Sequence, residues 1–506
     1  MKNKIFSLLI LPICLPFLFG CNSSKQNSDT NNLTIDIYAS NDIHGQIEEN
    51  GDRMDIVTYG TFMKNKGQEK NTLLLDQGDT WQGSIYSNYN HGAFINDIMC
   101  EAKFSARTVG NHDFDWGVEY LIENTKRSYN DYTVPVLAAN VYNYDFSSKE
   151  VGNIQQSDIG QKTITYTLDN GLKVGIVGVI GENQITSITS SYVKDLAFIN
   201  HVNVIKEEAT NLRNDGCDVV IASIHSGKDD VMNYGLSDYV DLVLCGHTHR
   251  LEVGVENGVY FAQFACYGEY IGHICLTYNQ KEKKVVNTKI ESLNKNKVSS
   301  IVNGNYDPNI LSIYNRYVNE CREQASQIVA NNVNYYFPRG GEAVNLMCTA
   351  ILDQTLKEGY DDVILSFCNT GRNNLPSYSW TYADLYSTFP FDNEVYIAEI
   401  KGTDITREIK RYSNICLNNN FDGHYQNDKT YKIACIDHLI YHTNSSRNFD
   451  YFPSFNGQPI GKLTKNYREI LRDYLIDNGY SEGKLLDVND YDSSLPQFSK
   501  GSLILD

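Results

Sequence analysis

Five short polar segments in this chain each follow a run of apolar or β-branched residues. These segments are Asp42-Ile43-His44, Gly78-Asp79, Gly110-Asn111-His112-Asp113, His225 and Gly246-His247-Thr248-His249. The runs before them, each typical of a buried strand, are residues 33–39, 72–75, 107–109, 219–224 and 240–245. Ligand sites of α/β proteins lie outside the carboxyl ends of their strands. The pattern therefore predicts a sheet with one edge that gathers carboxylates, a carboxamide and imidazoles.

The donor types in these segments predict a site for two divalent metal ions. Asp79 follows the central strand expected at residues 73–76, so its carboxylate is the best candidate to bridge the two ions. The ligands expected to complete one site are Asp42, His44 and His249. The ligands expected to complete the other are Asn111, His225 and His247. Mixed His, Asp and Asn donors suit Zn²⁺, Mn²⁺ or Fe, and the choice among these ions stays open.

Such a pair of ions is suited to the hydrolysis of phosphate esters. Two divalent ions about 3.5–4 Å apart lower the pKa of a shared water and offset the charge of the phosphoryl group. One Asp-x-His or Gly-Asp segment alone is more often a turn or a cap, but five segments in this order favour a metal site. We expect the remaining histidines to serve packing or to lie at the surface: His91, His201, His273, His424, His438 and His442.

The chain is long and acidic. Its 506 residues exceed what one hydrophobic core usually serves, so we expect two or three domains. The formal net charge of −19 argues against a broad basic surface for nucleic acid polymers. Bound cations could still attract a small anionic substrate, because they dominate the local field.

We expect the scattered cysteines after Cys21 to be mainly buried free thiols, with one or two disulfides as the alternative in an exported protein.

The first residues are typical of an export signal. Lys2 and Lys4 precede an apolar stretch at residues 5–19, and Leu18-Phe19-Gly20-Cys21 resembles a bacterial lipobox. We expect a lipoprotein signal peptide at residues 1–21, with lipidation at Cys21, and a flexible tether at residues 22–32. The protein would then be exported and lipid-anchored to the outer face of the bacterial cell membrane. A plain secretory signal is the alternative.

Strand-like and helix-like segments alternate from residue 33 to about residue 293, which predicts a layered α/β domain over residues 33–306. Apolar residues three and four positions apart predict a linker helix over residues 307–330. Asp307 and Pro308 are a good N-cap and a good first helical residue for it. Residues 331–506 are expected to form a second domain.

Three segments resemble the motifs of calcineurin-like metallophosphoesterases, and more narrowly those of the bacterial 5′-nucleotidase and UDP-sugar hydrolase family. They are residues 41–45, 78–84 and 110–117. The resemblance implies a four-layer α/β/β/α catalytic domain, a long linker helix and a C-terminal α+β substrate-binding domain. It also implies that His112 stabilises the transition state or assists the leaving oxygen, and that Asp115 orients His112. His249 replaces the Gln or Asn of several members, and imidazole is also a competent ligand.

In the second half of the chain the resemblance is weaker, but it indicates substrate contacts. Residues 368–372, which contain Asn369 and Arg372, look like a shortened form of the family's phosphate-binding segment. Phe391 follows Pro390 in a second matching segment and would stack on the base, and Arg339 would be a further phosphate contact. In a third segment, residues 447–453, Asp450 is kept but the flanking glycines are replaced by bulky residues. These residues could narrow the pocket.

The sequence therefore predicts a dimetal phosphoric ester hydrolase that releases phosphate from nucleoside 5′-monophosphates, with nucleotide sugars as further substrates, for scavenging extracellular nucleotides. Two alternatives stay open at this point. One is a 2′,3′-cyclic-nucleotide or UDP-sugar phosphodiesterase. The other is a surface lipoprotein that binds nucleosides without turning them over. The sequence leaves open the preferred base and the oligomeric state.

Overall fold

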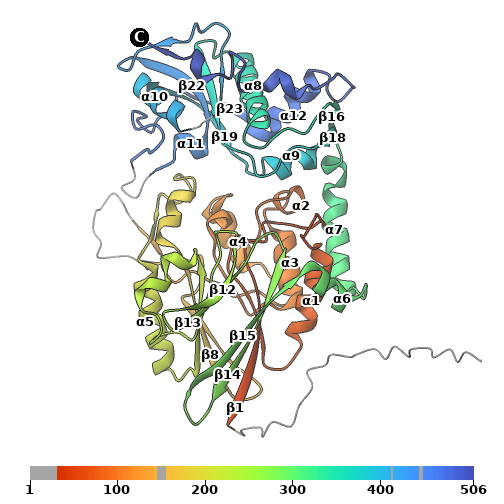
Figure 1. Ribbon diagram of the computed structural model, residues 1–506, viewed down its shortest axis with the longest axis vertical. Coiled ribbons are helices and arrows are strands. Elements are labelled where there is room, and N and C mark those ends of the chain that lie inside the picture. The colour runs from red at the N-terminus through yellow and green to blue at the C-terminus, as the bar shows by residue number, and fades with distance from the viewer. Residues whose placement is uncertain (1–30, 145–154, 412–413, 444–447) are drawn as a thin grey trace, which may run out of the picture.

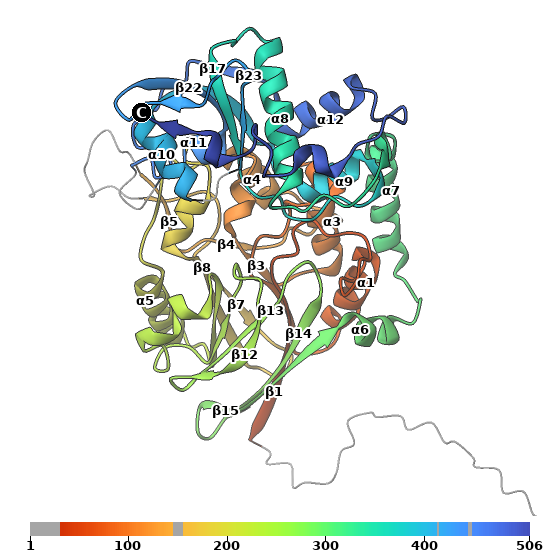
Figure 2. The same ribbon diagram turned by 45° about the horizontal axis from the view of Figure 1, so that its top comes forward.

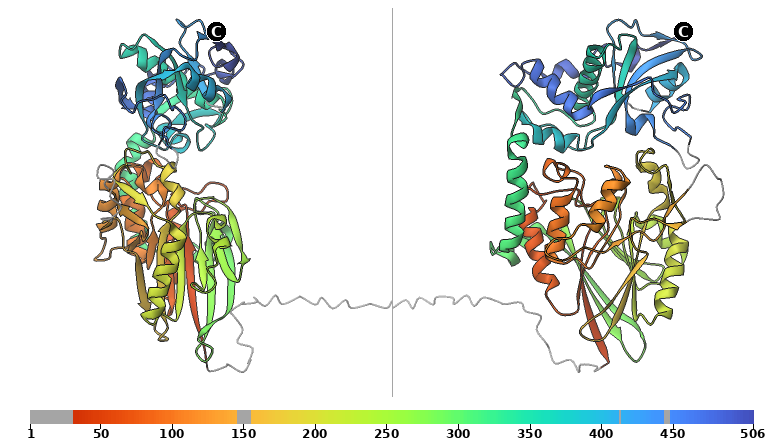
Figure 3. Two further views of the ribbon diagram at one scale, coloured as in Figure 1. Left: turned by 90° about the vertical axis from the view of Figure 1, so that its left-hand side faces the viewer. Right: turned by 180° about the vertical axis from the view of Figure 1, so that it is seen from behind.

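The computed structural model describes residues 31–144, 155–411, 414–443 and 448–506. The expected signal peptide with Cys21, nearly all of the expected tether and residue 447 lie outside the described residues. The chain forms an N-terminal and a C-terminal domain stacked along its long axis, and helix α7 runs along one side between them (Figures 1 and 3). None of the described helices is long and apolar enough to cross a membrane.

Two mixed sheets face each other in the N-terminal domain. The first has the order β15-β14-β1-β2-β3-β4, and the second has the order β12-β13-β11-β10-β8-β7. The strands of the first sheet are β1 (Asn32–Ser40), β2 (Thr72–Asp76), β3 (Ala106–Thr108), β4 (Val136–Leu137), β14 (Tyr270–Asn279) and β15 (Lys284–Asn294). Those of the second sheet are β7 (Thr163–Thr167), β8 (Lys173–Ile180), β10 (Val219–His225), β11 (Leu242–Leu244), β12 (Leu251–Glu256) and β13 (Val259–Phe264).

Three layers of apolar side chains hold this domain together. Between the sheets, Ile35 and Ile37 of β1 share a core with Ile176 of β8 and Ile221 of β10. The outer face of the first sheet packs against α1 (Ile56–Gly67), α3 (Ala93–Ala102) and α7 (Pro308–Ala325). The outer face of the second sheet packs against α5 (His201–Asn214). This arrangement confirms the four-layer α/β/β/α prediction.

The register of the parallel strands brings their carboxyl ends to one edge. Ser40 at the end of β1 lies opposite Asp76 at the end of β2, and Asp76 precedes the Gly78-Asp79 segment. In the second sheet β10 is parallel to both β8 and β11, so His225 ends its strand beside the loop that follows β11. The polar segments therefore leave both sheets on the side that faces the C-terminal domain.

The C-terminal domain is built on a five-stranded mixed sheet of order β20-β17-β22-β19-β23. Its strands are β17 (Val363–Cys368), β19 (Glu394–Lys401), β20 (Asn414–Leu417), β22 (Thr430–Ile436) and β23 (Gly461–Asn466). Its helices are α8 (Glu342–Lys357), α9 (Tyr382–Thr388), α10 (Gly402–Lys410), α11 (Asp437–Ile440) and α12 (Tyr467–Asp477). Helices α8 and α12 lie side by side in this domain (Figure 2).

Shorter elements complete both domains. The short helices are α2 (Ile85–Asn88), α4 (Val118–Lys126) and α6 (Lys295–Val302). Three small sheets are formed by β5 (Val141–Asn143) with β6 (Gln155–Gln156) and β9 (Leu196–Phe198), by β16 (Ile328–Val333) with β18 (Tyr378–Thr381), and by β21 (His424–Tyr425) with β24 (Ile504–Leu505). The ten cysteines of the described ranges are not joined in disulfides, and all but Cys275 are buried.

Linker helix α7 begins where the sequence predicts and ends earlier. The Asp307 side chain accepts hydrogen bonds from the backbone N–H groups of Asn309 and Ile310, as an N-cap does. The helix ends at Ala325, whereas the apolar spacing extended it to residue 330. Ile328 fits the spacing but instead begins β16, where it pairs with Thr381 of β18. The partner strand lies about 50 positions away in the sequence, so local periodicity could not reveal it.

One buried carboxylate fastens α7 to the catalytic domain. Asp97 of α3 is fully buried and accepts a hydrogen bond at 2.7 Å from the Tyr317 hydroxyl of α7. Arg316 of α7 also donates to this carboxylate, at 2.6 Å. Arg127 completes the cluster with two bonds at 2.8 and 3.2 Å. Helix α7 is therefore attached to the N-terminal domain.

We predict that Asp97→Asn destabilises the protein by about 1–3 kcal/mol, because Arg127 and Arg316 lose a buried counter-charge while remaining partly solvated. Chemical unfolding followed by fluorescence measures the change. Glu282→Gln is the matched control, since the Glu282–Lys284 pair is exposed, and its effect should stay within about 0.5 kcal/mol. Equal losses in both variants would contradict the role given to Asp97.

Candidate active site

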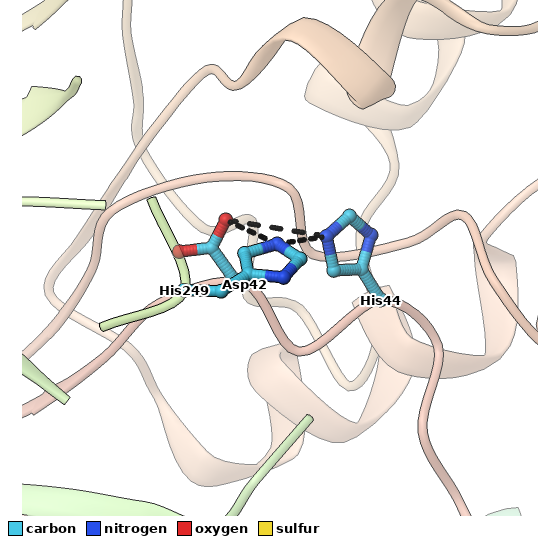
Figure 4. A group of neighbouring side chains, drawn as sticks. All are labelled: Asp42, His44 and His249. Carbon is cyan, nitrogen blue, oxygen red and sulfur yellow. Dashed lines mark hydrogen bonds and ion pairs between the residues drawn. The ribbon is translucent and has the colours of Figure 1, made fainter. Parts of the chain in front are cut away.

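The first metal-ligand cluster comes from the loop after β1 and the loop after β11. It consists of Asp42, His44 and His249, whose side chains point toward one another (Figure 4). The Nε2 atoms of His44 and His249 lie 3.0 Å apart, and His249 Nε2 lies 3.4 Å from Asp42 Oδ1. Two ring nitrogens and a carboxylate oxygen at these separations can all contact one ion at the usual ligand distance of about 2.0–2.2 Å.

The second cluster lies beside the first and uses the other ligands expected from the sequence. Asp79, His225 and His247 form its ionisable part. The Asn111 side-chain oxygen lies 3.1 Å from His225 Nε2 and 2.9 Å from His247 Nδ1. The structure therefore gathers all seven predicted ligand side chains into two neighbouring groups.

Asp79 connects the two clusters. Its Oδ1 accepts a hydrogen bond at 2.7 Å from the backbone N–H of His112. Its Oδ2 is buried, accepts no well-formed hydrogen bond within the described part of the chain, and lies 3.2 Å from His225 Nε2. The same oxygen lies 3.8 Å from His44 Nε2 of the first cluster. A buried oxygen with an unmet demand for positive charge fits a bridging ligand.

Surrounding groups orient the ligands for metal binding. His44 Nδ1 lies 3.1 Å from the Gln82 carbonyl, and His225 Nδ1 lies 2.7 Å from the Gln77 carbonyl. A proton on each Nδ1 leaves Nε2 with a free lone pair directed into the site. Asn41 donates to Asp42 Oδ2 at 2.7 Å. The chemistry and the orientation of these donors fit two divalent metal ions.

Five ligand residues have left-handed backbone conformations, which are unusual for residues other than glycine. Their φ angles lie between +52° and +71°, and the residues are Asp42, His44, Asp79, His247 and His249. Each such conformation costs about 1–3 kcal/mol and persists only when neighbouring structure enforces it. The rest of the fold therefore offsets an unfavourable backbone conformation that directs these side chains into the site. Such strain is typical of functional sites.

The loops that carry the ligands pack too closely for larger residues. A Cβ atom built on Gly110 would lie 2.2 Å from Asp79 Oδ1 and 2.3 Å from the Asp79 backbone nitrogen. Beneath them Asp113 accepts hydrogen bonds from the N–H groups of Thr80 and Gly110, at 3.2 and 2.8 Å. Buried Arg107 pairs with the same carboxylate. Asp113 therefore holds the two loops together rather than facing the metal site.

The predicted dyad is formed, and it meets the other domain. His112 Nδ1 lies 2.9 Å from Asp115 Oδ2. Burial opposes the charged imidazolium, but the carboxylates of Asp115 and Asp79 outweigh it and raise the pKa of His112. Arg372 of the C-terminal domain lies 2.8 Å from His112 Nε2, and the Phe391 ring stacks on the imidazole at a centroid distance of 5.2 Å.

A cavity of about 520 Å³ lies between the domains at this point. Metal-site residues line one side of it, and four predicted substrate contacts line it from the C-terminal domain: Arg339, Asn369, Arg372 and Phe391. The fifth, Asp450, does not line it. The Asp450 carboxylate lies 3.7 Å from His442 Nδ1 and 3.8 Å from Arg411 Nη2. Asp450 is therefore not part of the cavity lining, and its role as a substrate contact stays a prediction.

The cavity also contains residues that the sequence interpretation missed. His438 and His442, expected to serve packing or surface roles, line the cavity wall. Asp437 and Tyr192 line it as well. His438 lies in α11 and His442 follows it by two residues, and no local pattern in the sequence indicates that the two line this cavity. Four other histidines lie outside this cavity: His91, His201, His273 and His424.

Two family models match the chain, one for each domain. The calcineurin-like phosphoesterase model matches residues 35–251, and the 5′-nucleotidase C-terminal domain model matches residues 333–480. Together they include all seven predicted metal ligands and the cavity residues from both domains.

Individual proteins agree with these models. The chain is 28% identical to a 5′-nucleotidase of Diplobatis ommata over 64% of this chain and 59% of that protein. It is 22% identical to a probable 5′-nucleotidase of Treponema pallidum, over 81% of this chain and 80% of the relative. The fold is similar to that of a 5′-nucleotidase precursor from Thermus thermophilus, with a TM-score of 0.70, 18% identity and coverage of 94% and 99%. The chain therefore belongs to the 5′-nucleotidase family of calcineurin-like metallophosphoesterases.

Proposed function

We propose that this protein hydrolyses nucleoside 5′-monophosphates to nucleosides and phosphate. The observation that carries the proposal is the contact of Arg372 with His112 at 2.8 Å. This contact supports the proposal because the guanidinium of Arg372, which can bind an anion, lies beside His112 at the edge of the metal clusters. The cavity of about 520 Å³ at this junction is within the usual range for small-molecule sites and has room for a mononucleotide.

Seven side chains would hold the two metal ions, and the Asp79 carboxylate would be shared by both. The other ligands of one ion would be Asp42, His44 and His249. Those of the second ion would be Asn111, His225 and His247. When bound, two such ions lower the pKa of a water and offset the charge of the phosphate. The left-handed backbone of five of these residues keeps the donor atoms in place before any ion arrives.

His112 and Asp115 serve the leaving group. The Asp115 carboxylate fixes a proton on His112 Nδ1, so Nε2 faces the cavity as the atom that exchanges a proton or a hydrogen bond with the ester oxygen. Arg372 then moves from His112 Nε2 to the phosphate, where its guanidinium can donate two parallel hydrogen bonds. Arg339 and Asn369 supply further donors, and the Phe391 ring offers an apolar face to the base.

The direct test is phosphate release from AMP, measured with Mn²⁺ or Zn²⁺ present. We expect His112→Ala to lower kcat about 10²–10⁴-fold, because the leaving oxygen loses its proton or hydrogen-bond donor. His91→Ala is the matched control and should retain activity, since His91 stacks on Tyr120 outside the cavity.

UDP-glucose and a 2′,3′-cyclic nucleotide complete the panel for wild-type protein. Cleavage of either without phosphate release from AMP would replace the proposed reaction with a phosphodiesterase activity. Binding of adenosine without turnover of any ester, and with unchanged affinity in His112→Ala, would identify a nucleoside-binding protein instead.

The metal site can be tested without an activity measurement. We predict that wild-type protein, stripped by a chelator and dialysed against Mn²⁺ or Zn²⁺, retains about two equivalents by elemental analysis. Gly110→Ala should retain fewer, because its Cβ would collide with Asp79. Gly501→Ala is a control of similar chemistry, since its φ lies outside the left-handed range and the nearest atom to its Cβ position, Ser499 Oγ, is 3.4 Å away. Full metal content in Gly110→Ala would contradict the bridging role of Asp79.

We further propose that the protein is exported and anchored through lipid on Cys21, on the basis of the lipobox-like segment at residues 18–21. Cys21→Ser should then move the protein from the detergent phase to the aqueous phase in detergent partitioning of expressing bacteria. A variant at Cys14, within the apolar stretch, should remain in the detergent phase. Identical partitioning of wild type and Cys21→Ser would refute the anchor.

A further inference from the structure

Strand β12 is an outermost strand of the second sheet, and among the described residues no strand pairs with its free edge. Three apolar side chains of this strand are exposed: Leu251 by 46%, Val253 by 43% and Val255 by 55%. The strand contains neither proline nor lysine, and its pairing with β13 shows no register shift. A regular apolar edge without such interruptions is a template for pairing with another strand.

Strand β15, the outermost strand of the first sheet, lies on the same side of the N-terminal domain, since β13 packs against both β14 and β15. This second edge is protected in the usual way. It carries the exposed residues Lys284 and Lys289, and its pairing with β14 shifts register between Thr277 and Tyr278. Lysines and bulges at an edge oppose pairing with another chain. Of these two neighbouring edges, β12 is therefore the one suited to association.

Backbone groups of alternate residues in β12 face the free edge. The N–H of Ala265 donates to the Arg250 carbonyl at 3.0 Å, which makes Arg250 a hydrogen-bonded position of the β12–β13 pair. Hydrogen-bonded and non-hydrogen-bonded positions alternate along an antiparallel pair. The register continues without a shift, so the N–H and C=O groups that point away from the sheet belong to Leu251, Val253 and Val255.

The strand is complementary to itself in one antiparallel register. With a two-fold axis at Val253, Leu251 of one copy lies opposite Val255 of the other, and the outward N–H and C=O groups of both copies meet. The apolar side chains then share one face of the joined sheet. Arg250 and Glu256, whose side chains are 62% and 32% exposed, lie opposite each other at both ends. Opposite charges in such cross-strand positions attract.

Other registers fit less well. A shift by two residues in one direction places Glu252 opposite Glu256, and a shift in the other direction places Glu252 opposite its own copy. Like charges directly opposite each other are destabilising. A shift by one residue would turn the apolar side chains of the two copies to opposite faces. The sequence of β12 therefore selects a second copy of itself in a single register.

We propose that two copies of this protein associate through β12, antiparallel about Val253, and join their second sheets into one continuous sheet. A two-fold axis closes the assembly as a dimer. The contact involves one strand of six residues from each copy, so we expect a dissociation constant of about 1–100 µM, as for small transient interfaces. The inference is independent of the proposed reaction.

Disulfide cross-linking of the full-length protein on bacterial cells tests the register. In Val253→Cys the two thiols lie opposite each other, with Cα atoms about 5.5 Å apart, which is within the range of disulfides. We expect the oxidant diamide to produce a covalent dimer on non-reducing electrophoresis. Wild-type protein should produce none.

Val255→Cys is the matched control, because it is exposed on the same strand but lies opposite Leu251. Its two copies are four residues apart along the joined strands, about 13 Å, so this variant alone should not cross-link. Co-expression of Leu251→Cys with Val255→Cys chains should restore the covalent dimer. Equal cross-linking of Val253→Cys and Val255→Cys would overturn the register, because random collision does not distinguish them.

Sedimentation at protein concentrations of about 1–200 µM measures the association itself. All samples carry Cys21→Ser, so that no lipid contributes. We expect wild-type β12 to give a dimer at the high end of this range, and Val253→Lys to raise the dissociation constant at least about tenfold, because two lysines would meet at the axis. Ile301→Lys, at a position 48% exposed on α6, is the control and should retain the dimer.

A wild-type β12 sample that stays monomeric over the whole range, with no cross-link in Val253→Cys, would overturn the inference. Circular dichroism shows whether Val253→Lys is folded, and the cysteine variants decide if it is not. None of these measurements depends on phosphate release, so failure of the proposed function would leave them unchanged.

Discussion

The carboxylate of Asp79 is the group around which the catalytic domain is organised. One oxygen is held by the backbone N–H of His112, and the other is buried and faces imidazoles of both metal clusters. A buried carboxylate that accepts so few hydrogen bonds is stable in its ionised form only when cations lie nearby. The glycines at 78 and 110 let the two loops approach within contact distance of it. Metal binding, loop conformation and the position of His112 therefore depend on one another.

The proposed site also needs the contact between the two domains. The catalytic domain provides the predicted metal ligands and the His112–Asp115 pair. The groups that can bind a phosphate and a base belong to the C-terminal domain, after residue 331. Trp116 donates to Asp392 at 3.0 Å, and Asn88 donates to the Pro390 carbonyl at 2.6 Å, so the contact extends beyond the reacting groups. Because α7 is fastened to the catalytic domain through Asp97, a change in domain orientation would have to occur after Ala325, where the chain passes into β16.

Much of the fold and nearly all of the candidate metal site could be predicted from the sequence. The strands before Asp42 and Asp79, and the strand that ends at His225, could be predicted because alternating or continuous apolar residues mark a strand locally. In contrast, Ile328 continued the helical spacing of α7 but pairs with a strand formed by residues 378–381. Asp450 matched a family position in a segment whose neighbours differ in bulk, and it lies outside the cavity. No local signal indicated that His438 lines the cavity, because the other wall comes from residues such as His112 and Tyr192, which are far away in the sequence.

The sequence by itself determined which donor atoms are available and that they follow strands, because the spacing of apolar residues and the residue types are local properties. Only the tertiary structure decided that seven ligands from five distant segments converge and that Arg372 reaches His112. Those facts depend on strand order, register and domain contact. Each of these is set by burial and hydrogen bonding between segments tens to hundreds of residues apart, which no window along the chain contains.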